Sequence, residues 1–386
     1  MKKRSLLFSG LMLASVTTVQ ASPYGFSDAR SVAMGNASVA TGNLTTAALS
    51  NPAMMSVNAS DDSFAFLIPA IGVQAIDNGG MVDLLDDYQS IVDQYNAATG
   101  NPGVQAGLVT QLNNLLPQFN GTNVAALLSA STVLAYAGDG FSMAGFYHGS
   151  GQASLNINAT AGSGSTLPTG TLNAYGYTTQ EIGVSFSTKI SVAGMDLAVG
   201  ITPKTVQVDS IGYSANINIV DTGDVLSDAT ESDLGSFSTF DAGVALQLSD
   251  SLTFGLVAKN LLEETLVSGT ETFVFDRNLR AGVAYHNEFL TLAADMDLIE
   301  VEGSKTTNPL LITETGSKMA ALGIEFDLGD IVQLRAGYQT NMASGSNDPD
   351  LFSAGVGLWL GFHLDAAVVV GEDSSLGAFV QTGFRF

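Results

Sequence analysis

The sequence contains no cysteine and little charge. Its 386 residues include three His and one Trp, and only 13% are charged, against about 25% in soluble domains. The absence of cysteine excludes disulfides and thiolate chemistry. No run of 18 uncharged apolar residues occurs, so a bundle of transmembrane helices is not expected, although the mean hydropathy is positive at +0.26.

Basic residues are also scarce. Lys and Arg total 13 against 37 Asp and Glu, which gives a formal net charge of −24 at pH 7. Such a chain repels the phosphate backbone of nucleic acid, so no nucleic-acid partner is expected.

The first 21 residues have the composition of a signal peptide. A basic start at Lys2, Lys3 and Arg4 precedes the short apolar stretch LLFSGLMLASV, and small residues end it at Ala21. We therefore expect export, with cleavage after Ala21 and a mature chain that starts at Ser22. Cleavage removes three basic residues and no acidic ones, so the net charge changes from −24 to −27.

Alternating apolar and polar residues dominate the second half of the chain. In FDAGVALQL, Phe240, Val244 and Leu248 face one way, and Asp241 and Gln247 face the other way. A period of two residues is typical of β-strands. The pattern predicts fourteen strands, at residues 62–76, 130–138, 140–149, 177–190, 194–208, 236–249, 251–262, 278–287, 289–300, 316–328, 331–341, 350–360, 362–371 and 375–386.

These strands favour a transmembrane barrel over a secreted β-sandwich, which is the alternative. A sandwich would bury the apolar face of each strand, whereas a barrel turns that face to lipid and its charges to the lumen. Strands of about 9–12 residues are long enough to cross the hydrocarbon when tilted. The gaps between strands are alternately long and short, and an even strand count places the short turns in the periplasm. The predicted fold class is therefore all-β: a transmembrane antiparallel β-barrel of about 14 strands in the outer membrane of a Gram-negative cell.

Charged residues recur on the polar face of these strands, which a barrel turns toward its lumen. We expect them to form ion pairs that stiffen the barrel and hold any segment inside it. The predicted lumenal set is Asp241, Lys259, Arg280, Asp295, Asp297, Glu325, Asp327, Arg335, His363, Asp365 and Arg385.

The chain ends in GAFVQTGFRF, a strand whose last residue is aromatic. Phe384 and Phe386 lie on one face of this strand, because side chains two residues apart point the same way. The tail resembles the carboxy-terminal assembly signal of outer-membrane barrels. This resemblance implies that the barrel-assembly machinery reads the last strand.

A segment rich in small residues near the start carries a family resemblance. It reads GFSDARSVAMGNASVATGNLTTAALSNPAMMS, at residues 25–56. It resembles the amino-terminal segment of FadL-like outer-membrane proteins, and more closely that of conjugal-transfer TraF-type barrel proteins, which share the AR…AMG.A.VA run and the NPA triplet. The stretch FGLVAKNLLEE at residues 254–264 adds to the resemblance, and fourteen is also the strand count of FadL.

The resemblance implies a plug and a function. In FadL relatives this segment folds into the barrel, so Asn51, Pro52 and Ala53 would lie in a plug formed by residues 22–60, ahead of a barrel at residues 61–386. A polar lead-in without a plug role is the alternative. FadL substrates are long-chain fatty acids and other hydrophobic molecules, which implies passive transport of small hydrophobic molecules. The TraF-type resemblance leaves open a non-transporting envelope component of a conjugal transfer or secretion apparatus, with an unknown partner protein.

An insertion at about residues 80–128 follows the first predicted strand. In MVDLLDDYQSIVDQYNAA, Met81, Leu85, Tyr88 and Val92 share one helical face, and aspartates occupy most of the other. Two amphipathic helices in the first outside loop could cover a ligand site, dock a partner protein or pack on each other.

Motifs for chemistry are absent. The sequence has no HExxH, Walker or GxSxG motif, and its three His occupy separate strands. His363 and Asp365 share the lumenal face of one strand, which favours a polar pair over the converging Ser, His and acid of a hydrolase. No enzymatic activity, cofactor or metal site is predicted.

The first testable expectation concerns the location and form of the mature protein. It should start at Ser22, fractionate with the outer membrane and migrate differently on a gel before and after boiling, because a closed barrel has no strand edge to open. Amino-terminal sequencing and heat-modifiability measure this. Recovery as a soluble periplasmic protein would contradict the barrel.

Overall fold

The computed structural model describes residues 28–57, 63–119, 122–138, 140–192, 195–219, 230–268, 271–301, 305–306, 316–329, 331–346, 348–372 and 375–386. The predicted signal peptide and cleavage site lie outside the described residues. So do residues 22–27 and 58–60 of the predicted plug.

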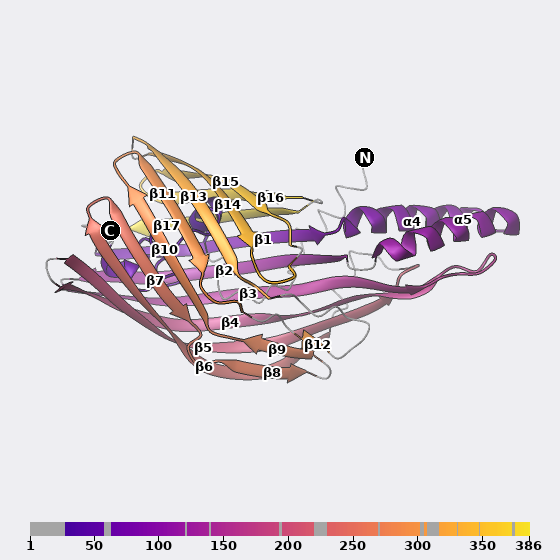
Figure 1. Cartoon of the computed structure of the whole chain (residues 1–386), viewed down its shortest axis with the longest axis horizontal. Coiled ribbons are helices and arrows are strands. Elements are labelled where there is room, and N and C mark those ends of the chain that lie inside the picture. The colour runs from indigo at the N-terminus through magenta and orange to yellow at the C-terminus, as the bar shows by residue number, and fades with distance from the viewer. Residues whose placement is uncertain are drawn as a thin grey trace.

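A closed antiparallel barrel of fourteen strands forms the body of the molecule (Figure 1). The barrel strands are β1 (Phe64–Asn78), β2 (Asn123–Gly138), β3 (Phe141–Thr160), β4 (Thr169–Val192), β5 (Met195–Asn216), β6 (Thr230–Ser249), β7 (Leu252–Lys259), β10 (Asn278–His286), β11 (Leu290–Asp297), β13 (Met319–Leu328), β14 (Val332–Asn341), β15 (Leu351–Trp359), β16 (His363–Gly371) and β17 (Leu376–Arg385). Consecutive strands pair in chain order, and β1 pairs with β17 to close the barrel. The predicted fold class and strand count are confirmed.

The two ends of the barrel differ in their connections. One end has tight turns and the carboxy-terminus, and we call it the short-turn end. Three of its turns contain a glycine in the left-handed region, Gly140, Gly329 and Gly361, with φ of +84°, +69° and +82°. This backbone conformation is accessible to glycine at little cost. The other end, the long-loop end, bears the longer connections.

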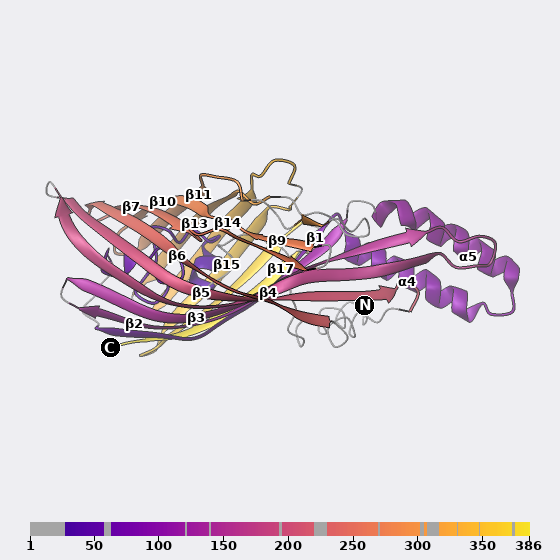
Figure 2. The same cartoon turned by 90° about the horizontal axis from the view of Figure 1, so that it is seen from below.

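Strands β3 to β6 extend well beyond the rest of the barrel at the long-loop end (Figure 2). They contain 20, 24, 22 and 20 residues, more than the sequence pattern predicts. The added parts, such as residues 150–160 and 169–176, are rich in Ser, Asn, Thr and Gly. The apolar alternation fades there because a strand beyond the bilayer no longer needs a lipid-facing side.

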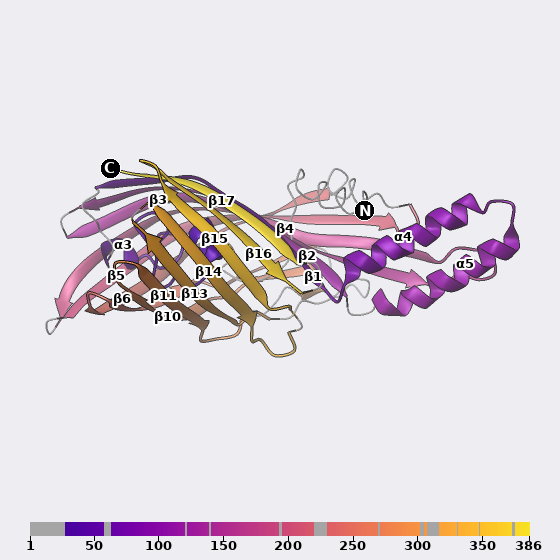
Figure 3. The ribbon, with the colours of Figure 1, turned by 90° about the horizontal axis from the view of Figure 1, so that it is seen from above.

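A helical hairpin packs on these extended strands (Figure 3). It comprises α4 (Met81–Ala97), α5 (Pro102–Leu115) and the 3₁₀ turn η1 (Leu116–Phe119), and β2 begins at Asn123, within the range expected for the insertion. Tyr88 is fully buried between the helices and the sheet and donates to Asn218 Oδ1 at 2.8 Å. Burial raises the pKa of Tyr88 to about 12. The apolar helix faces therefore pack on each other and on the strands.

A small second sheet occupies the long-loop end. Its strands are β8 (Glu264–Ser268), β9 (Glu271–Phe275) and β12 (Lys305–Thr306), which the sequence pattern did not predict. Phe273 and Phe275 of β9 pack edge-on against Tyr177 of β4, with ring centroids 5.2 and 5.3 Å apart. This aromatic cluster covers the inward face of β4 to β6 near the long-loop end.

Large apolar side chains alternate outward along the barrel strands. Ile182, Leu322, Phe352 and Val380 are 64%, 56%, 55% and 52% exposed, which is the surface that a barrel presents to lipid. Among the described residues, no helix is both long and apolar enough to cross a membrane.

The barrel closes where the last residue meets the first strand. Phe386 and Phe64 exchange backbone hydrogen bonds of 2.8 and 3.0 Å. Farther along this seam, the pairing of β1 with both neighbours shifts by one residue between Leu67 and Ala70. Pro69 lies in this bulge, where the missing N–H of proline is tolerated.

Replacing Phe386 with Asp should lower the yield of folded barrel. The Phe386 ring is 68% exposed and lies 6.2 Å from the Phe66 ring, so a charge there costs little in the folded core and acts on recognition of the last strand. We expect less heat-modifiable protein with unchanged export, and Phe386→Tyr as the control should assemble normally. Equal amounts of heat-modifiable protein from the wild type and Phe386→Asp would show that the tail is not an assembly signal.

Candidate functional site

Residues 28–57 lie inside the barrel, and we call them the inner segment. It contains the short helices α2 (Ala29–Ala33) and α3 (Met54–Val57). Asp28 begins α2 by accepting a hydrogen bond from Ser31 N at 2.8 Å, as helix-capping aspartates do. Apart from Arg30, Thr41, Asn43 and Val57, every residue of the segment is buried. The segment therefore fills the lumen.

The inner segment follows the circumference of the wall. Its contacts begin at β17, where Ala29 N donates to Gln381 Oε1 at 2.8 Å. They continue at β15, where Ser353 Oγ bonds Ala33 O and Gly35 N, both at 3.1 Å. At β14, Asn36 Nδ2 donates to Gln339 Oε1 at 2.7 Å. The segment thus passes the strands in the reverse of their chain order.

Two charged wall residues hold the segment by its backbone. Asp295 of β11 accepts hydrogen bonds from the backbone N–H groups of Ser38 and Val39, at 2.7 and 2.9 Å. Lys259 of β7 donates to Leu49 O at 2.5 Å. Hydrogen bonds to charged groups are stronger than those between neutral groups. These two side chains therefore fix the segment on either side of residues 40–48.

The triplet Asn51-Pro52-Ala53 is buried against β4 to β6. Asn51 Nδ2 donates to Val39 O at 2.9 Å and to Val244 O of the wall at 3.3 Å. Ser187 of β4 donates to Ala53 O at 3.2 Å. The asparagine therefore ties two turns of the segment to each other and to the wall.

One charge network joins the segment to β13, β14 and β16. Arg30 donates to both carboxylate oxygens of Glu325, at 2.9 and 3.0 Å. Arg335 bonds the same carboxylate and also Asp365, at 2.6 Å to the latter. Gln381 donates to the second oxygen of Asp365 at 2.8 Å. Removing one member of such a buried network costs about 3–5 kcal/mol, because a charge is left unpaired.

A second charge network lies within the wall. Lys204 of β5 bridges Glu181 of β4 and Asp241 of β6, at 3.0 and 3.3 Å. Arg280 of β10 pairs with Asp297 of β11 at 2.6 Å. Opposite charges on adjacent strands thus stiffen the wall from inside.

Sequence reasoning found part of these networks. Of the predicted lumenal residues, eight are buried in the contacts just described or in their networks: Asp241, Lys259, Arg280, Asp295, Asp297, Glu325, Arg335 and Asp365. The other three, Asp327, His363 and Arg385, line a cavity, and so do Glu325, Arg335 and Asp365. The His363 ring contacts the Trp359 ring at a tilt of 51°, with ring centroids 4.2 Å apart, and Asp327 accepts a hydrogen bond from Gln333 at 2.8 Å.

Three partners were missed: Arg30, Glu181 and Lys204. Glu181 and Lys204 lie at inward positions of their predicted strands, and counting in steps of two along residues 177–190 and 194–208 would have found them. Arg30 lies in the amino-terminal segment, where no periodicity indicates the direction of a side chain.

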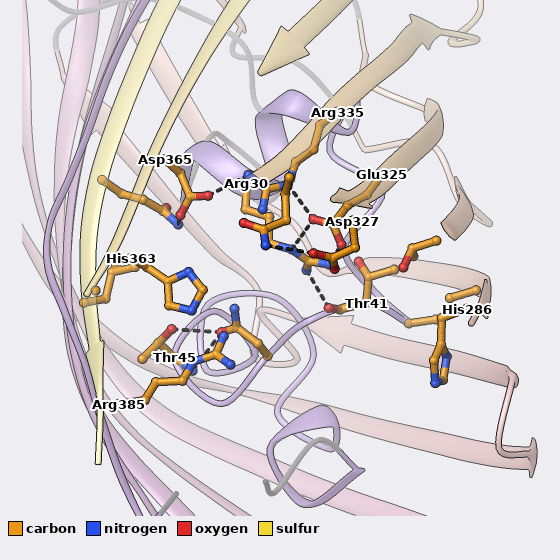
Figure 4. A pocket seen from close by; sticks show the side chains of 18 of the residues that line it. Arg30, Thr41, Thr45, His286, Glu325, Asp327, Arg335, His363, Asp365 and Arg385 are labelled. Carbon is orange, nitrogen blue, oxygen red and sulfur yellow. Dashed lines mark hydrogen bonds and ion pairs between the residues drawn. The ribbon is translucent and has the colours of Figure 1, made fainter. Parts of the chain in front are cut away.

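A polar cavity of about 460 Å³ lies between the inner segment and the wall at the short-turn end. Arg30 and Thr41 of the segment, together with Glu325 and Arg335 of the wall, line it (Figure 4). His363 and Arg385 lie on one side and His286 on the other (Figure 4). The described residues include no group of three or more acidic or His side chains that could hold a metal ion.

An apolar cluster lies beside this cavity inside the lumen. Leu44 and Leu49 of the segment pack with Leu67, Val133 and Phe146 of β1 to β3. Much of the remaining wall surface in this cluster is alanine. The apolar contact between segment and wall is therefore a packed core, and the open space next to it is polar.

Comparison with protein families identifies one match. A sequence model of the family described as "F plasmid transfer operon, TraF, protein" matches residues 48–297. A comparison with curated proteins finds no match.

Three solved structures have a similar fold. The match with the P. putida toluene transporter TodX covers 95% of this chain and 99% of that chain, with a TM-score of 0.55 and 13% sequence identity. The match with a Pseudomonas aeruginosa FadL homologue covers 96% of this chain and 98% of that chain, with a TM-score of 0.54 and 13% identity. The match with the CymD monoaromatic hydrocarbon channel covers 93% of this chain and 97% of that chain, with a TM-score of 0.52 and 11% identity. At these identities the likeness establishes the fold alone.

Asp295→Ala should destabilise the folded barrel. The change leaves the buried N–H groups of Ser38 and Val39 without their acceptor, at a cost of about 1–3 kcal/mol each. Asp295→Asn keeps an acceptor oxygen and is the matched control. We expect the temperature at which the heat-modifiable form is lost to fall most in the alanine variant. Unfolding of Asp295→Ala at the wild-type temperature would show that the contact does not hold the segment.

Proposed function

The chain belongs to the TraF family and has the fold of FadL-like barrels, and we propose that it passively transports small hydrophobic molecules across the outer membrane. Three features support the membrane assignment: the export signal, the outward belt of large apolar side chains, and the paired seam that leaves no strand edge. Its partners are then outer-membrane lipid and the barrel-assembly machinery, which reads Phe384 and Phe386.

We place the short-turn end in the periplasm. The first strand begins at this end and the last strand finishes there, as expected for an even number of strands. The helical hairpin and the extended strands then project outside the cell. The polar cavity opens toward the periplasm, and the aromatic cluster of Tyr177, Phe273 and Phe275 lies at the outer mouth.

In this proposal the inner segment is the plug, and residues 40–48 are its movable part. The observation that carries the proposal is the contrast between these residues and their flanks. Residues 28–39 and 49–55 bond the wall. The hydrogen bonds described for residues 41–46 stay within the segment. Thr41 Oγ1 donates to Ala37 O at 2.8 Å, Asn43 Oδ1 accepts from Thr45 N and Thr46 N, both at 3.0 Å, and Thr41 O accepts from Arg30 Nη1 at 2.8 Å.

Movement of this loop would join two regions of the lumen. Leu44 is 2% exposed in the apolar cluster, whereas Thr41 and Asn43 line the polar cavity. A shift of residues 40–48 would open the alanine-rich surface of β1 to β3 toward the cavity. A small hydrophobic molecule could occupy that surface while the flanks of the plug stay in place.

A non-transporting envelope component is the second candidate. The observation that favours it is the polarity of the open cavity, which Arg30, Glu325, Arg335 and Asp365 line. Hydrophobic ligands bind predominantly apolar pockets. In that case the barrel would anchor the outer projection to the membrane and would conduct nothing.

Loosening the loop should separate the two candidates. Asn43→Ala removes the acceptor of Thr45 N and Thr46 N, whereas Asn43→Asp keeps an acceptor oxygen at that position and serves as the matched control. In a transporter, Asn43→Ala should change the uptake of a monoaromatic hydrocarbon probe by cells severalfold, while heat-modifiability stays intact. Asn43→Asp should stay close to the wild type.

The baseline of the same assay decides whether any transport occurs. Cells that express the wild-type protein should take up the probe faster than cells that carry the empty vector. Equal uptake in those two strains, with folded barrel in the membrane, would reject transport and leave the envelope component.

A further inference from the structure

We propose that the inner segment is an internal template on which the barrel wall closes, and that its flanks remain a permanent part of the folded protein. This inference concerns assembly. It therefore stands or fails independently of whether the protein transports anything.

The wall carries a row of inward glycines along much of its contact with the segment, and we call this row the glycine track. Its members lie on seven strands, β5, β6, β7, β10, β13, β14 and β15. They are Gly200, Gly243, Gly255, Gly282, Gly323, Gly337 and Gly355. Three pairs of them lie directly opposite each other on adjacent strands: Gly200 and Gly243, Gly255 and Gly282, and Gly323 and Gly337.

No side chain fits on the track while the segment is in place. A Cβ atom at Gly200 would lie 2.5 Å from Ala53 N, and one at Gly323 would lie 2.6 Å from Met34 O. Real Cβ atoms essentially never approach other atoms closer than 3.0 Å. At Gly337 the neighbour is the backbone of Gly35, itself a glycine. The backbones of wall and segment are therefore in direct contact.

The contacts follow one order around the barrel. Ala33 meets β15, Met34 and Gly35 meet β13 and β14, and Val39 meets β7 and β10. Asn51 and Pro52 then meet β6 and β5. The segment thus links strands from residue 200 to residue 355, which otherwise meet only through their immediate neighbours.

Glycine weakens a strand, because it loses more backbone freedom and packs no side chain. Without the segment, seven inward glycines would leave the lumen with no packed side chains. This wall therefore suits a lumen that the segment fills. The segment precedes β1 in the chain and is available before β17 completes the barrel. A removable plug would need only side-chain contacts that can be remade, whereas backbone contact along the track requires the wall to form around the segment.

Valine substitutions on the track test the template. Gly200→Val and Gly337→Val push the wall against segment backbone. Gly145→Val and Gly212→Val are matched controls, because a Cβ at either of these strand glycines meets nothing within 4 Å. Two readouts are taken from the full-length protein: the heat-modifiable fraction, and trypsin cleavage after Arg30, the one basic residue in residues 22–57.

If the segment is a template, the heat-modifiable fraction of both track variants should fall by roughly tenfold, which corresponds to the usual free-energy cost of overpacking a packed interior. The barrel that does fold should stay resistant to trypsin at Arg30. The control variants should fold like the wild type. A wild-type yield from the track variants, or a folded barrel in which Arg30 is cut, would overturn the proposal in favour of a removable plug.

A compensating pair excludes a general folding defect. A Cβ at Gly243 meets only Asn51 and Pro52 among its nearest neighbours, and its closest contacts are the Oδ1 and Cγ atoms of Asn51. Asn51→Ala removes both atoms, so the double variant Gly243→Ala with Asn51→Ala should fold better than Gly243→Ala alone. If the double variant folds no better than Gly243→Ala, the loss does not come from contact with the segment and the template is rejected.

Discussion

Direct contact between the backbone of the inner segment and the backbone of the wall is the constraint on which the other features depend. It requires glycine at Gly337 and Gly323 in the wall and at Gly35 in the segment. With the two chains this close, Asp295 can reach the N–H groups of Ser38 and Val39, and Lys259 can reach Leu49 O. The filled lumen in turn buries the charge networks of the wall.

The charges are stable in the lumen because each has a partner close by. Arg280, Asp297 and Arg335 are almost completely buried, and a buried charge without a partner would be expensive. The outward face bears apolar side chains instead, so the same strands meet lipid on one side and a polar, packed interior on the other. The polar cavity lies where this packing ends, at the short-turn end.

The barrel was predictable from sequence because its signal is repeated. Each strand that faces lipid needs apolar side chains at every second position, and fourteen such segments give the strand count. The long extensions of β3 to β6 and the strands β8 and β9 were missed, since no lipid-facing side imposes a period there. The inward direction of Asp241, Arg280 and Asp295 followed from the strand period, but their partners did not. Asp295 binds backbone N–H groups, and Lys204 bridges two strands, and neither contact leaves a pattern in the sequence.

A barrel built around its own amino-terminal segment can still admit small molecules if only residues 40–48 move. The account therefore makes its central claim about the flanks, residues 28–39 and 49–55. Hydrogen exchange of the folded protein in detergent tests it most directly, because exchange reports the free energy of local opening. The account predicts that the amides of Ser38, Val39 and Ala53 are protected to the same degree as the ladder amides of β13 and β14. Exchange of these three amides orders of magnitude faster than the ladder, with the wall intact, would contradict it.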